Sequence, residues 1–395
     1  MSRFFDVMRD RSSWLRMRRE GDEGKVVYPE LFFDLVFVFS IVQLSHTLAE
    51  HYSPAGIGKA IILILAVWWV WNFTTWVTNW LDPDRTPVRG LLFVLMFCGL
   101  VLSASIPDAF GEKSLLFAVT YVLMQVGRSL FAVYALRGHS PVHYLNFLRI
   151  TCWLSCSAVF WLAGAFAGGE AQLFLWIAAI VIEYLSPALG FQVPGLGRSK
   201  VDDWDVLGAH MAERCALFVI ICLGEALLVT GRVFSEMELS ALTLSMFFAA
   251  FASTVTMWWI YFRFGQARAA QSIENANRPG VLARTVFTYA HLPIVSGIIL
   301  CAVAEEFMLA HPYGATDVKM ASAILAGPAI FLAGNIWIKA SVAPRLPVSH
   351  LVGIGLLAAM VPVSLMVQPY QLYFAAVIIL IIVALWEYLA LKVIP

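Results

Sequence analysis

Acidic side chains stand inside an apolar run near the start of this sequence. Glu30 and Asp34 are four residues apart, so a helix places both on one face. Asp34 lies nine residues beyond Lys25, which is ~13 Å along a helix at a rise of ~1.5 Å per residue. A carboxyl group that deep in apolar surroundings must bind a proton, pair with a cation or line water. Glu30 has a simpler alternative, since an acid near a helix N-terminus is favourable.

A second apolar run combines an acid with two bases. His210, Arg214 and Glu225 fall on one helical stripe, at spacings of four and eleven residues, and Glu213 directly precedes Arg214. Glu225 lies about as deep in its run as Asp34 does in the first one. These residue types suit either a pathway for protons or cations, or an ion pair that fastens helices together.

The segments that carry these side chains are long enough to cross a membrane. Hydrophobic residues make up 61% of the 395 residues, 13% are charged, and the mean hydropathy is +0.79. Soluble domains hold roughly 25% charged residues, and a helix crosses a bilayer with ~20 apolar residues. The sequence therefore predicts an all-α polytopic integral membrane protein with about twelve membrane-spanning helices, near residues 26–49, 58–81, 90–106, 115–136, 148–167, 172–190, 212–230, 240–262, 285–304, 320–340, 349–366 and 370–392.

Basic residues predict the orientation of these helices. The large majority of the 26 Lys and Arg residues fall in the N-terminal segment and in the connections that follow even-numbered spans, Lys339 among them. Basic residues collect on the cytoplasmic side of a membrane. Both termini are therefore expected in the cytoplasm. The eleventh span is the weakest of the twelve, because Pro362 interrupts it.

Four short matches between the two halves predict an internal duplication. The domains expected are a basic cytoplasmic N-terminus (1–25), a first six-helix repeat (26–200) and a second one (201–395). Six helices per repeat keep both repeats in the same orientation, a recurrent plan of transporters. The alternative is an old duplication that persists only for packing. The matches are Glu183-Tyr184-Leu185 with Glu387-Tyr388-Leu389, Trp68-Trp69 with Trp258-Trp259, Gly127-Arg128 with Gly334-Asn335, and Glu30 with Glu213.

The predicted orientation brings several ionisable residues to one depth in the cytoplasmic half of the bilayer. Arg128 matches Asp34 and Glu225 in depth, while Glu183 and His291 can approach the same level. A charged residue costs ~2.5–3.5 kcal/mol at the centre of a membrane helix on insertion scales. We therefore expect Asp34, Arg128 and Glu225 to come within contact or one-water distance, with Glu183 or His291 nearby. Two interpretations stay open, a static ion pair between helices and an ion pathway.

The second predicted span is unusually polar. Asn72, Thr75, Asn79 and Asp82 recur every three to four residues, in a segment that is also rich in Trp. Such a stripe either lines a cavity or provides hydrogen bonds between helices.

Several of these motifs resemble the bacterial low-temperature-requirement protein A family over nearly the whole chain. Cys215-Ala216 and Ala226 depart from the usual family pattern but touch no ionisable position. The resemblance implies a multi-pass protein of the bacterial inner membrane and implies no particular reaction. It rests on residues 30–39 (ELFFDLVFVF) with 43–45 (QLS), on 74–76 (TTW) with Asn79 and Asp82-Pro83, and on His210, Glu213-Arg214, 217–221 (LFVII) and 223–225 (LGE).

A transporter or channel that handles protons or cations is the leading functional hypothesis. Its partners would be the lipid bilayer and a proton, cation or small solute, without nucleic acid, and the sequence predicts no particular oligomeric state. A membrane-embedded enzyme and a structural or stress-adaptation protein are the alternatives. His210 and Glu213 are a candidate pair of metal ligands, whereas a catalytic metal needs about three. The six cysteines are interpreted as small buried residues, so we expect no disulfide, metal or cofactor.

Overall fold

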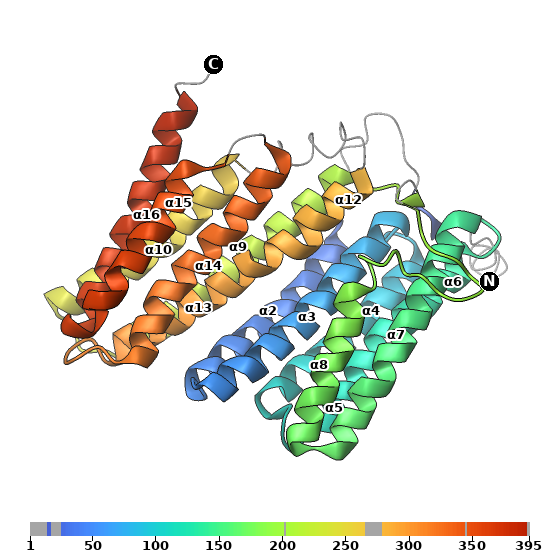
Figure 1. Ribbon diagram of the computed structural model, residues 1–395, viewed down its shortest axis with the longest axis horizontal. Coiled ribbons are helices and arrows are strands. Elements are labelled where there is room, and N and C mark those ends of the chain that lie inside the picture. The colour runs from blue at the N-terminus through green and yellow to red at the C-terminus, as the bar shows by residue number, and fades with distance from the viewer. Residues whose placement is uncertain (1–13, 17–24, 201–202, 265–278, 344–345, 393–395) are drawn as a thin grey trace. The chain divides into compact units, whose positions relative to one another are not determined.

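The computed structural model describes residues 14–16, 25–200, 203–264, 279–343 and 346–392. Over these ranges the chain is helical and forms no β-strand (Figure 1). Most of the predicted N-terminal domain, residues 1–25, lies outside the described residues. Among these described residues, eleven helices are long and apolar enough to cross a membrane. The prediction of a multi-pass helical membrane protein is therefore confirmed.

The helices coincide with the predicted spans along the chain. Their bounds are α2 (Tyr28–Glu50), α3 (Pro54–Trp80), α4 (Thr86–Ser105), α5 (Ser114–Val122) continuing into α6 (Arg128–Leu136), α7 (Pro141–Ala167), α8 (Gly169–Leu185), α9 (Gly208–Ser235), α10 (Ala241–Phe264), α12 (Pro279–Ala283) continuing into α13 (His291–Ala310), α14 (Val318–Val342), α15 (Val348–Met360) and α16 (Pro369–Lys392).

The predicted sixth span is shorter than the others. Its helix, α8, has 17 residues and is the one predicted span outside the eleven. α8 packs against α7 after a tight reversal of the chain at Gly168 and Gly169 (Figure 1). Their φ angles of +66° and +55° are the left-handed conformations that glycine adopts without a steric penalty.

Several of the described helices change their winding along their length. π-helical turns join α5 to α6 at Leu123–Gly127 and α12 to α13 at Arg284–Ala290. A 3-10 segment, Val361–Met366, extends α15. The change at Val361 confirms that Pro362 interrupts the eleventh span, because proline lacks the N–H that an α-helix needs.

The chain divides into two compact units. Unit 1 comprises residues 1–44, 57–211 and 278–281, and unit 2 comprises 45–56, 212–277 and 282–395. α2 and α9 therefore each contribute to both units. Within unit 1, α3 is buried continuously from Ala66 to Trp80. The cytoplasmic half of this predicted span is thus buried on every side, and the polar stripe that contains Asn72, Thr75 and Asn79 is enclosed together with the apolar residues around it.

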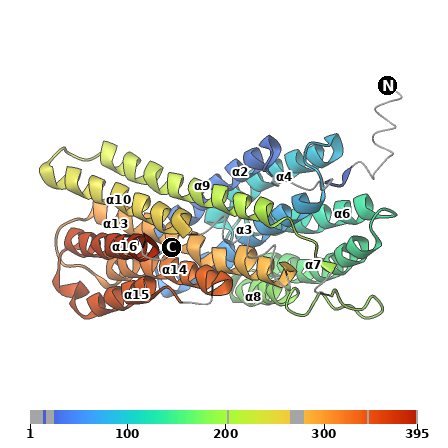
Figure 2. The same cartoon turned by 90° about the horizontal axis from the view of Figure 1, so that it is seen from above.

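Small residues bring α13 and α14 together in unit 2. A Cβ atom added to Gly297 would stand 2.5 Å from the backbone nitrogen of Phe331, and one added to Gly334 would stand 2.6 Å from Ile294. Glycines at such positions let membrane helices approach closely. In Figure 2, α15 and α16 lie beside α14 of this pair, and α14, α15 and α16 contact one another.

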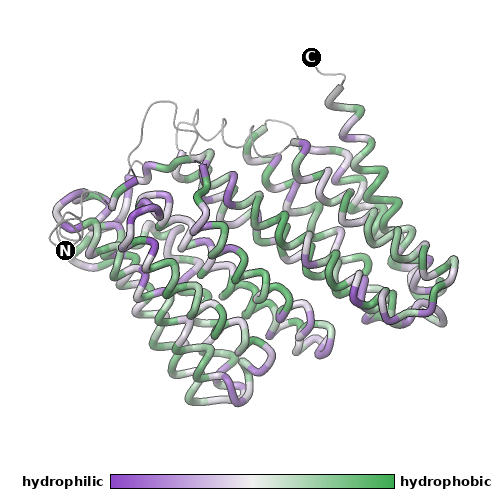
Figure 3. Tube along the Cα trace, turned by 180° about the vertical axis from the view of Figure 1, so that it is seen from behind, coloured by the Kyte–Doolittle hydropathy of each residue, from purple (hydrophilic) through white to green (hydrophobic). Residues whose placement is uncertain are grey.

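Apolar side chains dominate the outer surfaces of the helices. Phe93, Phe97 and Leu100 of α4 are exposed, as expected of side chains that face lipid. In Figure 3 hydrophilic residues gather at helix ends and in connections. All six cysteines are free. Cys152 and Cys156 are exposed on α7, which corrects the interpretation that all six are buried, because the exposed face of a membrane helix is itself apolar.

Candidate functional site

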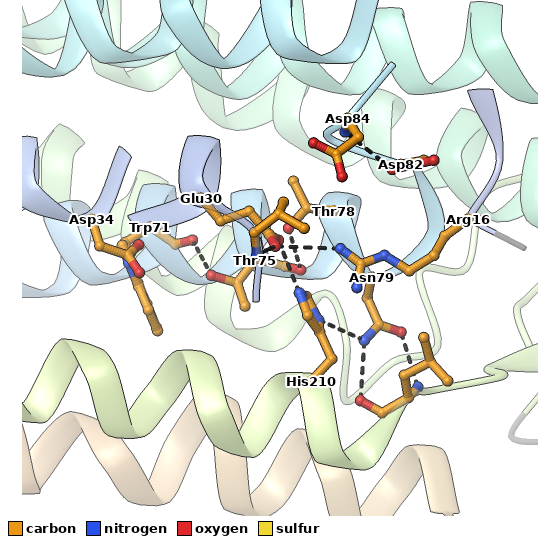
Figure 4. A network of polar contacts seen from close by, with 12 residues as sticks. Arg16, Glu30, Asp34, Trp71, Thr75, Thr78, Asn79, Asp82, Asp84 and His210 are labelled. Atoms are coloured by element: carbon orange, nitrogen blue, oxygen red, sulfur yellow. Dashed lines mark hydrogen bonds and ion pairs between the residues drawn. The ribbon is translucent and has the colours of Figure 1, made fainter. Parts of the chain in front are cut away.

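A hydrogen-bonded cluster joins three helix ends in unit 1. Glu30 stands in the first turn of α2, Asn79 near the end of α3 and His210 in the first turn of α9. One carboxylate oxygen of Glu30 lies 2.9 Å from Nε2 of His210, and the other accepts from Arg16 at 3.3 Å. Figure 4 shows these side chains pointing toward one another. Glu30, Asn79 and His210, candidates from the sequence, therefore lie together.

Asn79 fixes the tautomer of His210. The backbone N–H of Leu207 donates to Oδ1 of Asn79, and Nδ2 of Asn79 donates to the Leu207 carbonyl, so the amide has one orientation. Its N–H₂ group then lies 3.1 Å from Nδ1 of His210, which must accept. Nε2 of the neutral imidazole consequently carries the proton and donates to Glu30. Together with Arg16, this arrangement favours an ionised Glu30 that fastens the helix ends.

Asp34 and Arg128 do not form the expected ion pair. Asp34 accepts from Nε1 of Trp71 at 2.7 Å. The guanidinium of Arg128 instead donates to a carbonyl, a hydroxyl and an amide oxygen. In the described part of unit 1, Arg128 makes no ion pair with Asp34. Direct contact between these two side chains is therefore not found, because a buried guanidinium can bind neutral oxygen atoms, which a pattern of charges does not reveal.

Neutral groups surround Arg128. Its guanidinium donates to the carbonyl of Val70 at 3.1 Å, to Oγ1 of Thr74 at 3.0 Å and to the side-chain oxygen of Gln125. Gln125 in turn donates to the hydroxyl of Tyr121 at 3.1 Å. Gln125 lies in the π-helical turn between α5 and α6, and such turns occur frequently at functional sites.

The chain of hydrogen bonds ends at Glu183 of α8. Tyr121 donates to one carboxylate oxygen of Glu183. Ser157 and Trp161 of α7 donate to the other one at 2.7 and 3.0 Å. Glu183 is 1% exposed. No base of the described ranges lies within ion-pair distance of its carboxylate, and the guanidinium of Arg128 acts on its charge only from farther away. Arg128, Gln125, Tyr121 and Glu183 thus form one buried chain in unit 1.

A different arrangement surrounds the acid on the last helix of unit 2. Lys339 of α14 lies 2.5 Å from Glu387 of α16 and 3.0 Å from Nε2 of His350 on α15. Ser349 lies 3.1 Å from Nδ1 of the same imidazole. Lys339 was assigned from the sequence to a cytoplasmic connection, and the structure corrects this. It occupies the last turn of α14 and is 3% exposed, because the long side chain turns inward to an acid.

The remaining candidates are placed individually. Nε2 of His291 lies 2.9 Å from the hydroxyl of Tyr261, and its Nδ1 lies 2.7 Å from the Val286 carbonyl. Asn72 is buried in α3, Arg214 and Glu225 are buried in α9, and Glu213 is half-buried there. The expected ionisable layer is thus divided between the two units.

The side chains that hydrogen-bond to Glu183 are not among the candidates from the sequence. Tyr121, Ser157 and Trp161 are ordinary in an apolar segment, and no local pattern distinguishes them. Glu305, a buried acid of α13, directly follows the ninth predicted span (285–304) and is not among the candidates from the sequence, although an acid beside an apolar run is itself a signal. Across the ranges that the structure describes, no three His, Cys, Asp or Glu residues group closely enough to hold a metal ion.

Comparisons with known proteins place this architecture in a family. The model of the family described as "Bacterial low temperature requirement A protein (LtrA)" matches residues 25–385. The chain is 47% identical over 380 residues to the uncharacterized protein RA0937 of Rhizobium meliloti (strain 1021), covering 96% of this chain and 92% of that protein. No solved structure matches. The resemblance noted in the sequence is thereby confirmed, and the chain belongs to the bacterial low temperature requirement A family.

Proposed function

We propose that this protein is a transporter or channel of the bacterial inner membrane whose buried acids bind protons or cations. The observation that carries the proposal is the environment of Glu183. The side chain is enclosed by two hydroxyl groups and an indole, and its carboxylate has no cation in direct contact in the described part of unit 1. Buried acids that hold helices together pair with a base, whereas acids in transport pathways exchange a proton or an ion.

The hydrogen-bond count at Ser157 supports a proton as one occupant. The hydroxyl of Ser157 lies 3.0 Å from the carbonyl of Leu154 and 2.7 Å from Glu183. It has a single hydrogen, so it cannot donate to both oxygen atoms. A protonated carboxyl group donates to Ser157 and leaves the serine free to donate to Leu154. An ionised carboxylate instead competes with the carbonyl for that hydrogen.

The proposal includes the duplicated six-helix plan, which two aromatic contacts support. Tyr184 follows Glu183 and stacks on Trp69, with ring centroids 4.0 Å apart. Tyr388 follows Glu387 and lies edge-on to Trp259 at 6.0 Å. The matched motifs of the two halves therefore make the corresponding contact, from the sixth span to the second, within each unit. Parallel repeats of this kind are typical of transporters.

The expected topology has both termini in the cytoplasm. Reporter fusions near Arg198 and after Lys392 should give a cytoplasmic signal, and fusions near Gly168 and Pro312 should give an external signal. One clear reversal among them would contradict the twelve-span arrangement.

Ion flux in proteoliposomes tests the function directly. The full-length protein is reconstituted, and flux is measured across imposed H⁺, K⁺ and Na⁺ gradients for the wild type, Glu183→Gln, Asp34→Asn and Glu225→Gln. Glu170→Gln is the matched control, because Glu170 is exposed on the same helix as Glu183. We expect flux of one ion in the wild type and in the control, and loss of that flux in Glu183→Gln. A folded wild-type protein that moves none of the three ions would refute the proposal.

A further inference from the structure

A second buried acid of unit 2 is enclosed by neutral hydroxyl groups. Glu305 of α13 is 0% exposed. Its Oε2 lies 2.7 Å from Oγ1 of Thr230 on α9, and its Oε1 accepts from the hydroxyl of Tyr373 on α16 at 2.9 Å. Ser253 of α10 lies against the same tyrosine hydroxyl. Side chains of α9 and α16 thus meet at one carboxyl group of α13, and α10 supports the tyrosine hydroxyl.

No base balances the charge that an ionised Glu305 would carry. The titratable groups that face it are the hydroxyl of Tyr373 and the thiol of Cys301, both neutral at ordinary pH. Within the described residues of unit 2, no Lys, Arg or His forms an ion pair with Glu305. An isolated buried carboxylate is costly enough that such a group takes up a proton instead.

The hydrogen bonds form a complete set when Glu305 carries a proton. The hydroxyl of Thr230 lies 2.9 Å from the carbonyl of Ala226 as well as 2.7 Å from Glu305. It has one hydrogen for these two oxygen atoms. A protonated Oε2 of Glu305 donates to Thr230, Thr230 donates to Ala226, and Tyr373 donates to Oε1. The hydroxyl hydrogens of Glu305, Thr230 and Tyr373 then have one acceptor each, as those of Glu183 and Ser157 do in unit 1.

The same geometry disfavours a metal ion at Glu305. Cations such as Ca²⁺ take about six to eight oxygen ligands. The side chains that contact Glu305 add only the hydroxyl oxygen atoms of Thr230 and Tyr373, and both hydroxyl groups already take part in hydrogen bonds with the carboxyl group.

Glu305 lies close to the external end of its helix in the predicted orientation. It stands five residues before the end of α13 at Ala310, ~7.5 Å along the axis at a rise of ~1.5 Å per residue. Thr230 stands five residues before the end of α9 at Ser235, and Tyr373 is the fifth residue of α16. The three side chains therefore meet about one and a half helical turns below the surface.

We propose that Glu305, Thr230 and Tyr373 form a proton-binding site near the external end of unit 2. The carboxyl group holds one proton at neutral pH and exchanges it with the external solution. This site is separate from Glu183, and its protonation does not depend on whether the chain transports an ion. In a transporter it would serve as the external proton acceptor.

Infrared spectroscopy of the full-length protein in lipid nanodiscs tests this assignment. A protonated carboxyl group gives a C=O stretching band that an ionised carboxylate lacks, and transfer to D₂O shifts that band. We expect such a band at pH 7 in the wild type and loss of its Glu305 component in Glu305→Gln, while any component from Glu183 remains. Glu306→Gln is the matched control, because Glu306 is the adjacent residue and is only half-buried, and it should keep the band.

A second variant protects the test against misfolding of Glu305→Gln. Tyr373→Phe removes the hydrogen bond to the carbonyl oxygen of the protonated acid, so the band should persist and move to higher frequency. Absence of a C=O band in folded wild-type protein would overturn the proposal, and so would a band that neither variant changes. Glu183→Gln, measured in parallel, separates any contribution of the acid in unit 1.

Discussion

Glu183 and Glu387 stand in the same sequence motif but have opposite environments. Each begins a Glu-Tyr-Leu motif; Glu183 of α8 contacts side chains of α5 and α7, and Glu387 of α16 contacts Lys339 of α14. Tyr, Ser and Trp surround Glu183, whereas Lys339 pairs with Glu387 at 2.5 Å. A shared motif therefore does not imply a shared role. The paired acid is suited to hold helices, and the acid among neutral donors is suited to exchange a proton.

Where the first and third spans of each half meet, the acid among neutral groups is in unit 2 instead. In unit 1 the hydroxyl groups of Ser40 and Ser103 meet at 2.5 Å. In unit 2 the corresponding spans meet through Thr230 and Glu305 at 2.7 Å. Glu183 of unit 1 and Glu305 of unit 2 thus both accept from neutral donors, but they stand on different helices. If the halves are duplicates, their acidic sites have diverged in a complementary way.

The largest expected effect comes from breaking the ion pair of unit 2. Lys339→Ala should destabilise the protein by ~3–5 kcal/mol, because removing one partner leaves a buried charge without compensation. Thermal unfolding in detergent, at matched protein concentration, measures the loss. The double variant Lys339→Ala with Glu387→Gln should recover much of it, since both charges are then absent. If the single and double variants were equally stable, Glu387 would not be the paired acid described above.

Replacement of Glu183 should change ion flux strongly and stability little. Glu183→Gln keeps the size of the side chain and adds no uncompensated charge, so we expect a stability change within about 1 kcal/mol. Ion flux should nevertheless be lost, as argued for the proposed function. A destabilisation as large as that of Lys339→Ala would mean that Glu183 is also a structural acid.

Sequence patterns predicted the helices well because lipid imposes strong rules on them. Every backbone polar group of a spanning segment must be satisfied internally, so long apolar runs become helices. The pairing of side chains was less predictable. An ion pair between Arg128 and Asp34 was expected because both residues are charged. The hydrogen-bond partners of Arg128 are instead a carbonyl, a hydroxyl and an amide oxygen. Lys339 was assigned to a connection because a basic residue ends an apolar run whether or not it turns inward.

A smaller effect is expected where the hydrogen-bonded chain of unit 1 is interrupted. Tyr121→Phe removes the hydroxyl between Gln125 and Glu183 and should destabilise the protein by about 1–3 kcal/mol, because it leaves buried polar atoms without a partner. If the proposed function holds, flux should slow but persist, since Glu183 keeps its contacts with Ser157 and Trp161. Equal flux in wild type and Tyr121→Phe would exclude the tyrosine from the pathway.

The smallest effect should come from Ser103, where unit 1 has a hydroxyl in place of the acid of unit 2. Ser103→Ala removes the contact with Ser40 and a bond to the Gly99 carbonyl at 2.7 Å. That carbonyl remains bonded within its helix, so we expect a loss of about 1 kcal/mol in unfolding free energy. Thr230→Ala in unit 2 should cost about as much, yet it alone should shift the infrared C=O band of Glu305. A band shift in Ser103→Ala, or none in Thr230→Ala, would contradict the difference between the units, because only Thr230 contacts a carboxyl group.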